Sequence, residues 1–126
     1  MANKNVLIIG EDPALIDFDA PDAPKDMSAE KVMTGLNGSV TRLQSAGHDA
    51  ELLLTRNADS IEAQVRDALQ GKNFDVIVVG AGLRTLPLMA EQFERLMNVL
   101  SDRSPQSKLA FNSQPDDSDI AAFRWL

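Results

Sequence analysis

Two short apolar runs constrain the fold of this chain more than any other feature. The first covers residues 6–9 and stops at Gly10, and the second covers residues 76–79 and stops at Gly80. Both runs are continuous rather than alternating and are rich in β-branched residues. That pattern is typical of strands covered on both faces within a parallel sheet. The runs therefore predict a parallel sheet with helices packed on both sides.

Weaker apolar runs at residues 51–55 and 108–112 indicate two edge strands. Between the strands, apolar residues recur at the spacing of an amphipathic helix. The helices predicted in this way cover residues 28–46, 59–70 and 85–100, with a short last one from residue 116 or 117.

Residues with capping chemistry mark the ends of these helices. Asp59 with Glu62 three positions later forms a capping box, which predicts the start of the second helix. The other predicted starts and stops are Ser28, Gly47, Gly71, Thr85 and Pro87.

Strand and helix alternate four times, which predicts a single α/β domain over residues 1–126. Four strands suit a three-layer half-Rossmann or flavodoxin-like fold with a four-stranded parallel sheet of order 2-1-3-4. Right-handed crossovers would place the first helix on one face and the second and third on the other. The last helix should return beside the first.

Composition excludes several kinds of site. The chain has no cysteine, which removes disulfides, thiol nucleophiles and thiolate metal sites. Its one histidine, His48, falls in a helix-to-strand turn, at the edge of the sheet where the strands begin. A net charge of −7 argues against nucleic acid as the partner. No export signal or membrane segment is visible, so we expect a cytoplasmic protein.

The connection over residues 10–27 carries most of the charge. It holds six acids and one lysine, a net −5, whereas the rest of the chain is only −2. Leu15, Ile16 and Phe18 within it should anchor it as an acidic lid. A cation bound by the acids of this segment is the alternative, although their spacing matches no metal-binding loop. The acids considered for it are Glu11, Asp12, Asp17 and Asp19.

The fold itself predicts where a site would lie. Ligands of open parallel sheets bind beyond the carboxyl ends of the strands, where the winding reverses, and here that point lies between the first and third strands. The candidate ligand-binding residues are Gly10, Glu11, Asp12, Gly80, Ala81, Gly82, Arg84, Asn112 and Ser113.

The turn over residues 80–84 is the best single candidate among them. Its glycines would let backbone amides approach a ligand, and Arg84 could bind an oxyanion such as phosphate or carboxylate. The alternative is a tight structural turn with Arg84 paired to an acid of the 10–27 segment. A dinucleotide site is disfavoured because Thr85 stands at the third glycine position. No cofactor follows from the sequence.

Glu11 and Asp12 after the first strand resemble the acidic pair of response-regulator receiver domains, and Ser113 falls near their strand-4 hydroxyl. Gly80 stands where the phospho-accepting aspartate should be, and the fifth strand with its lysine is missing. The resemblance therefore implies, as an alternative function, a non-catalytic interaction module. A homodimer through Phe123, Trp125 and Leu126, helped by the edge of the fourth strand, would suit it, and packing of these three residues beside the first helix is the other explanation.

Catalysis is not expected, because no residue is arranged to activate a nucleophile. Glu11 or Asp12 as a base with Ser113 as a hydroxyl donor is the enzymatic alternative. Gly35 and Gly38 inside the first helix indicate close packing against the sheet or the 10–27 segment, with an approaching ligand as the other explanation.

Several short sequence segments together resemble a group of short uncharacterised bacterial proteins. The resemblance runs nearly end to end, implies a complete stand-alone domain, and brings no activity or catalytic residue with it. The segments are residues 12–13, 16–18, 29–31, 80–84, 110–113 and 124–126.

Overall fold

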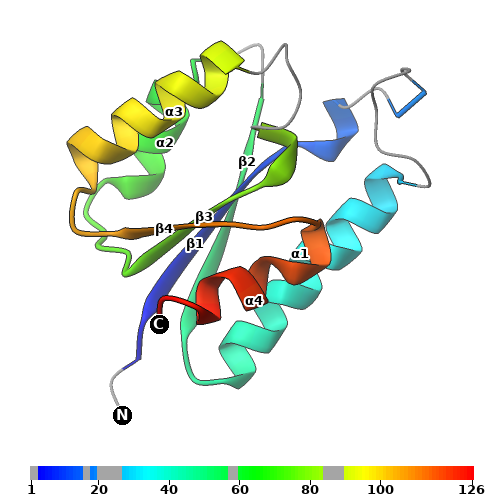
Figure 1. Ribbon diagram of the computed structural model, residues 1–126, viewed down its shortest axis with the longest axis horizontal. Coiled ribbons are helices and arrows are strands. Elements are labelled where there is room, and N and C mark those ends of the chain that lie inside the picture. The colour runs from blue at the N-terminus through cyan, green and yellow to red at the C-terminus, as the bar shows by residue number, and fades with distance from the viewer. Residues whose placement is uncertain (1–2, 16–17, 20–26, 57–59, 84–89) are drawn as a thin grey trace.

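The computed structural model describes residues 3–15, 18–19, 27–56, 60–83 and 90–126 (Figure 1). All strands of its sheet are parallel, in the order β2-β1-β3-β4. This confirms the predicted three-layer α/β fold and its strand order. The strands are β1 (Asn5–Glu11), β2 (Asp49–Thr55), β3 (Val76–Val79) and β4 (Lys108–Phe111). The helices are α1 (Ala29–Ser45), α2 (Ile61–Leu69), α3 (Ala90–Arg103) and α4 (Ser118–Phe123).

Helices cover both faces of the sheet, as Figure 1 shows, with α2 and α3 on one side and α1 and α4 on the other. The central strands β1 and β3 supply fully buried side chains to both sides, which explains their continuous apolar runs. Leu7, Ile9, Ile77 and Val79 pack with α2 and α3. Val6, Ile8, Val76 and Val78 pack with α1 and α4.

Strand β1 is longer than its apolar run. It continues through Gly10 to Glu11, because β2 still pairs with it there, with Glu11 opposite Thr55. The prediction that Gly10 ends the strand was therefore wrong. The consequence for function is that Glu11 is held on a strand rather than in a loop.

Polar caps and glycines define the helix ends. Ser28 caps α1 as predicted, and its hydroxyl accepts a hydrogen bond from the Lys31 amide. Ser60, rather than the predicted Asp59, caps α2, since its hydroxyl accepts from the Ala63 amide. After these helices, Gly47 and Gly71 adopt positive φ angles of 93° and 72°, a conformation that favours glycine.

The last helix returns beside α1 as predicted, and a 3₁₀ turn over Pro115–Asp117 leads into it. Gly35 of α1 lies directly under this turn. A β-carbon at Gly35 would stand 2.9 Å from the Asp116 nitrogen and 3.0 Å from Pro115 Cβ. The close packing predicted for Gly35 is therefore real, but it is made with the turn before α4 rather than with the sheet.

Within the described ranges, no helix has the length and apolar character needed to cross a membrane.

Candidate functional site

The structure brings the ends of β1, β3 and β4 together at the predicted edge of the sheet. Glu11, at the end of β1, is only 8% exposed. A β-carbon built on Gly82 would lie 3.9 Å from Glu11 Oε2, the sole close atom found among the described residues. The Glu11 carboxylate therefore faces the turn that follows β3.

Gly80 is a glycine for packing reasons. Its amide donates to the Ile9 carbonyl at 2.8 Å, and a β-carbon would stand 3.1 Å from that same oxygen. The residue thus lets β3 close onto β1 at its end. Gly10 has no such crowding, because its β-carbon would make an ordinary contact with Leu36 at 3.7 Å.

Asn112 connects the turn after β3 to the start of α4. Its Oδ1 accepts from the Ala81 amide at 2.8 Å, and its Nδ2 donates to Ser118 Oγ at 2.8 Å. The Ser118 hydroxyl in turn donates to the Pro115 carbonyl at 3.0 Å. Asn112 and Ser118 are both buried, so this chain of hydrogen bonds fixes the strand ends relative to one another.

This arrangement changes how the turn could bind an anion. The amides of Gly80 and Ala81 already donate to Ile9 and Asn112 within the protein. An anion near Gly82 would also lie close to the Glu11 carboxylate, which repels it. Arg84, the residue predicted to bind the anion, lies outside the described residues, as do Thr85 and Pro87.

Asp12 acts at the end of β1 as a turn former. Its Oδ1 accepts from the Ala14 amide at 3.0 Å, and its own amide donates to the Thr55 carbonyl at 2.8 Å. Its Oδ2 lies 3.7 Å from Arg56 Nε, in a partly exposed ion pair. The Asp12 charge is therefore partly balanced from the end of β2.

Ser113 lies beyond the buried layer. It is exposed, and its amide donates to Asp117 Oδ1 at 3.0 Å, which orders the turn toward α4. The enzymatic alternative needs Glu11 or Asp12 as a base for the Ser113 hydroxyl, and in the described part of the chain the carboxylate that Ser113 contacts is that of Asp117, through its amide.

One anchor predicted for the 10–27 segment is present. Phe18 and Met27 pack against the core between the sheet and α1. Ile16, Asp17 and the side chain of Leu15 lie outside the described part of the structure. Across the described ranges, no three acidic or histidine side chains gather in a way that could hold a metal ion.

His48 lies at the opposite edge, as predicted. Its Nδ1 accepts from the Lys4 amide at 3.2 Å, and its ring contacts that of Phe123 with centroids 6.1 Å apart. These contacts join the start of the chain and the end of α4 to the turn after α1, so His48 has a structural role there.

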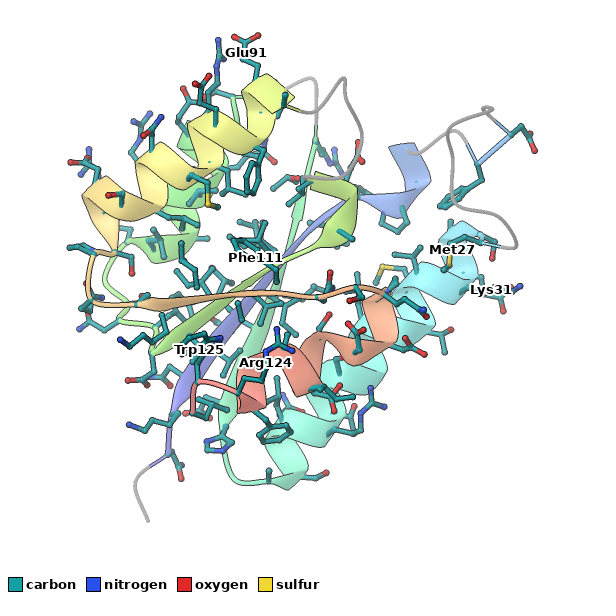
Figure 2. The ribbon with its side chains drawn as sticks, viewed as in Figure 1. Met27, Lys31, Glu91, Phe111, Arg124 and Trp125 are labelled. Carbon is teal, nitrogen blue, oxygen red and sulfur yellow. The ribbon has the colours of Figure 1, made fainter. Side chains whose placement is uncertain are left out.

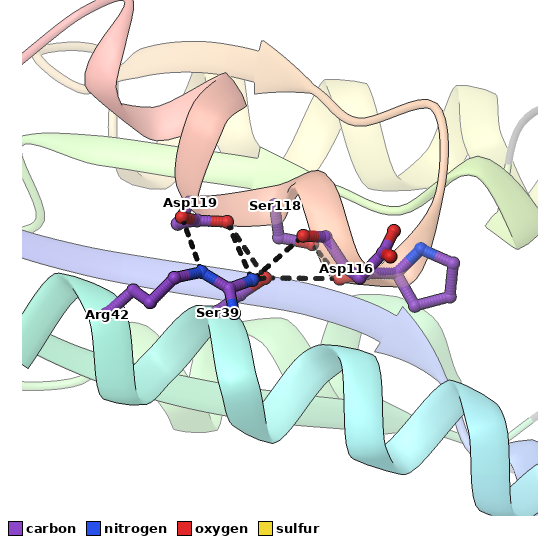
Figure 3. Close-up of polar contacts among 6 residues, drawn as sticks. Ser39, Arg42, Asp116, Ser118 and Asp119 are labelled. Atoms are coloured by element: carbon purple, nitrogen blue, oxygen red, sulfur yellow. Dashed lines mark hydrogen bonds and ion pairs between the residues drawn. The ribbon is translucent and has the colours of Figure 1, made fainter.

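Sequence reasoning missed a polar cluster between α1 and α4 (Figure 3). Arg42 holds Asp119 through Nε at 2.8 Å and Nη2 at 3.1 Å, and its Nη2 also donates to the Asp116 carbonyl at 2.8 Å. The Ser39 hydroxyl donates to Asp119 at 3.3 Å. Arg42 and Asp119 are separated by 77 positions, so no local sequence pattern indicated that they would pair.

Opposing effects set the pKa values in this cluster. Burial by itself would raise the pKa of Asp119, but the hydrogen bonds and charge of Arg42, helped by the Ser39 hydroxyl, lower it below its usual range. The hydrogen bond to Asp119 raises the pKa of Arg42 in turn. Both groups therefore stay charged at neutral pH and clamp α4 onto α1.

The exposed apolar surface of the described chain lies near its end (Figure 2). Phe123 is 42% exposed and Trp125 is 51% exposed, as an interaction surface would require. Leu126 differs, because it packs partly buried against the core on the α1 side. Phe111 of β4 and Ile120 of α4, which were not predicted, are exposed as well.

Comparison with known proteins gave no match to any family model, to any curated protein or to any solved structure.

Proposed function

We propose that the protein is a binding domain that holds a small anionic ligand at the carboxyl ends of β1 and β3. The observation that carries the proposal is the buried polar layer at this edge of the sheet. Glu11, Thr55, Asn112 and Ser118 are all less than a tenth exposed there. An open parallel sheet places its ligands at this same point, beside the reversal of winding between β1 and β3.

The layer also suggests what the ligand must offer. Glu11 is a hydrogen-bond acceptor beside Gly82 in the turn after β3. A ligand that fits both would carry a hydroxyl or ammonium group for Glu11 and an anionic group for Arg84. Hydroxy acids, amino acids and sugar phosphates have this chemistry.

Thermal unfolding against a ligand panel tests the proposal. The panel holds inorganic phosphate, small hydroxy and amino acids, sugar phosphates and nucleotides. A ligand at one hundred times its Kd stabilises the fold by about 2.7 kcal/mol, which raises the Tm by roughly 8–15 °C in a domain of this size.

Two variants then locate the site. Arg84→Ala should abolish most of the shift, since a charged hydrogen bond is worth about 1.5–3 kcal/mol. Arg95→Ala on the outer face of α3, where Arg95 pairs only with Glu91 among the described residues, serves as the matched control. A panel without any shift, or equal shifts in both variants, refutes the proposal.

A second function is favoured by a separate observation. All the large exposed hydrophobic side chains of the described chain lie from Phe111 onward, and contiguous exposed apolar surface marks interaction sites. The alternative is therefore a non-catalytic, self-associating interaction module. Analytical ultracentrifugation should show that Trp125→Ala associates more weakly than the wild type, and that Arg95→Ala associates as strongly as the wild type. Equal association of the two variants counts against the interaction module.

Cytoplasmic location and the exclusion of nucleic acid stay predictions from composition.

A further inference from the structure

Strand β4 is an open edge of the sheet. Its neighbour is β3, and the Lys108 amide donates across to the Asp75 carbonyl at 2.9 Å. Because alternate residues of a strand direct their backbone groups to opposite sides, Leu109 and Phe111 direct theirs away from β3. The Phe111 carbonyl confirms this direction, since Arg124 Nη2 donates to it from outside at 3.0 Å.

Apolar and basic side chains surround this edge. We call Lys108–Phe111 with Ile120, Arg124 and Trp125 the edge surface. Figure 2 shows Phe111, Arg124 and Trp125 along β4, and Ile120 lies one helical turn before Arg124, on the same side of α4. Phe111 is 41% exposed, Ile120 58% and Trp125 51%. An exposed edge of this kind is a template for pairing with another strand.

We propose that the edge surface binds a second copy of this chain, with the two β4 strands antiparallel about a two-fold axis at Ala110. This inference rests on the interaction module proposed above as the second function, and it names the partner and the register. The product would be one continuous sheet of order 2-1-3-4-4-3-1-2.

The side chains are complementary in this register. Leu109 of one copy lies opposite Phe111 of the second copy, and the symmetry repeats the pair. Both residues face the α2 and α3 side of the sheet, where Leu109 joins the core and Phe111 contacts the Phe93 ring at 6.2 Å. Cross-strand aromatic–aliphatic pairs of this kind stabilise antiparallel strands. On the other face, Ala110 is small enough to meet its own copy at the axis.

The charges are complementary as well. The same register sets Lys108 opposite Asn112 of the second copy, directly before the turn that carries Asp116 and Asp117. Lys108 is exposed, and the described part of the chain provides it with no ion pair. The Asp116 side chain is exposed, and only its backbone carbonyl is used by Arg42. We therefore expect the acidic turn of a second copy to approach each lysine, in a protein whose net charge is −7.

The exposed side chains supply part of the area that a symmetric interface needs. Phe111, Ile120 and Trp125 are each about half exposed. Aromatic side chains bury roughly 150–250 Å² when fully covered, so Phe111 and Trp125 supply about 200 Å² in each copy, and Ile120 adds to this. The backbone of β4 and the stems of Lys108 and Arg124 add to this area, toward the roughly 800 Å² per partner of standard interfaces.

The first experiment blocks the edge without disturbing the ladder inside one copy. The Leu109 amide points away from β3, so Leu109→Pro removes no hydrogen bond to β3, and proline is tolerated on an edge strand. Leu109→Ala is the matched control, since it loses the same side chain but keeps the amide. Light scattering across a concentration series should show a dimer for the wild type, a weaker dimer for Leu109→Ala, which loses the two Leu109–Phe111 contacts but keeps the amide, and a monomer for Leu109→Pro.

The second experiment tests the register and does not depend on proline being accepted. Lys108→Glu should raise the Kd of the dimer by roughly tenfold, because two exposed ion pairs become two like-charge contacts. Adding Asp116→Lys to Lys108→Glu should restore the wild-type Kd.

The outcomes separate the two ideas. If the wild type forms a dimer that neither Leu109→Pro nor Lys108→Glu weakens, the pairing through β4 is overturned and the interaction module stands. A wild type that stays monomeric at its highest soluble concentration overturns both. Loss of the dimer in Leu109→Pro, with charge-reversal rescue, supports the proposed register.

Discussion

The clamp between α1 and α4 gives the sharpest stability prediction. Asp119→Asn removes the negative charge that Arg42 holds through two hydrogen bonds of 2.8 and 3.1 Å, while keeping the shape of the side chain. The Asp119 side chain is 7% exposed, but that of Arg42 is 50% exposed. Hydrogen bonds to a charged group contribute about 1.5–3 kcal/mol, and the exposure of Arg42 screens part of this.

We therefore expect Asp119→Asn to lower the free energy of unfolding by about 1–2 kcal/mol. For a domain of this length the Tm should fall by roughly 4–10 °C. Urea unfolding at pH 7, followed by circular dichroism, measures the difference. Asp116→Asn is the matched control, because it removes an exposed charge on the same turn but leaves in place the Asp116 backbone carbonyl, to which Arg42 Nη2 donates.

The pH dependence gives an independent check on the same pair. The pKa of Asp119 is lowered in the folded state by Arg42 and Ser39 against the opposing effect of burial. A carboxyl with a lowered folded pKa contributes its full stability above its unfolded pKa of about 3.9, and loses it as the pH falls toward the folded value. The difference between wild type and Asp119→Asn should therefore stay constant from pH 7 to about 5, and should narrow below about 4.

Two results would refute this reasoning. One is a loss of stability no greater in Asp119→Asn than in Asp116→Asn. The other is a difference that persists unchanged at acid pH, which would show that the effect comes from packing rather than from charge. A double-mutant cycle with Arg42→Ala should give a coupling energy of about 1–2 kcal/mol, since the residues share one hydrogen-bonded contact.

Three further changes test the packing, each by thermal or urea unfolding. Gly35→Ala should destabilise the fold by about 1–3 kcal/mol, because its β-carbon would press on the backbone of the turn before α4 at 2.9 Å. Gly38→Ala should destabilise it less, because its β-carbon would meet a side-chain atom, Arg42 Nη1, at 3.1 Å, and a side chain can shift more easily than backbone. Equal effects of the two changes would contradict the packing argument. Asn112→Ala should destabilise the fold by about 1–3 kcal/mol, because the partly buried Ala81 amide loses the Asn112 side chain as its acceptor. An unperturbed Tm would show that this bond is dispensable. Gly71→Ala should lower the free energy of unfolding by about 1 kcal/mol, because residue 71 has a φ of 72°. An unchanged stability would mean that the turn relaxes to another conformation.

The structure also separates what local pattern could predict from what it could not. The two continuous apolar runs predicted β1 and β3 as the central strands, because only strands buried on both faces can lack polar residues. Right-handed crossovers then left few alternatives for the strand order and for the faces of the helices. Boundaries were less accurate: β1 extends to Glu11 because β2 pairs beside it, a fact that no local pattern contains.

The sequence predicted which strand ends lie side by side, but not what their polar residues contact. Fold geometry alone placed the ends of β1 and β3 together. What each residue does there depends on partners far along the chain. Asn112 was predicted to face a ligand, yet its amide group binds Ala81 and Ser118. Glu11 and Gly82 were predicted as neighbours of one ligand, and the structure places the carboxylate against the turn itself.

The sequence by itself determined the layers, the strand order and the edge where a ligand would bind, because these follow from burial, periodicity and handedness, which are local or general properties. Only the tertiary structure decided which polar groups meet. Arg42 and Asp119 lie 77 positions apart, and Ala81 and Asn112 lie 31 apart. The first pairing depends on how α4 packs on α1, and the second depends on where neighbouring strands end. No local sequence pattern indicates either of these arrangements.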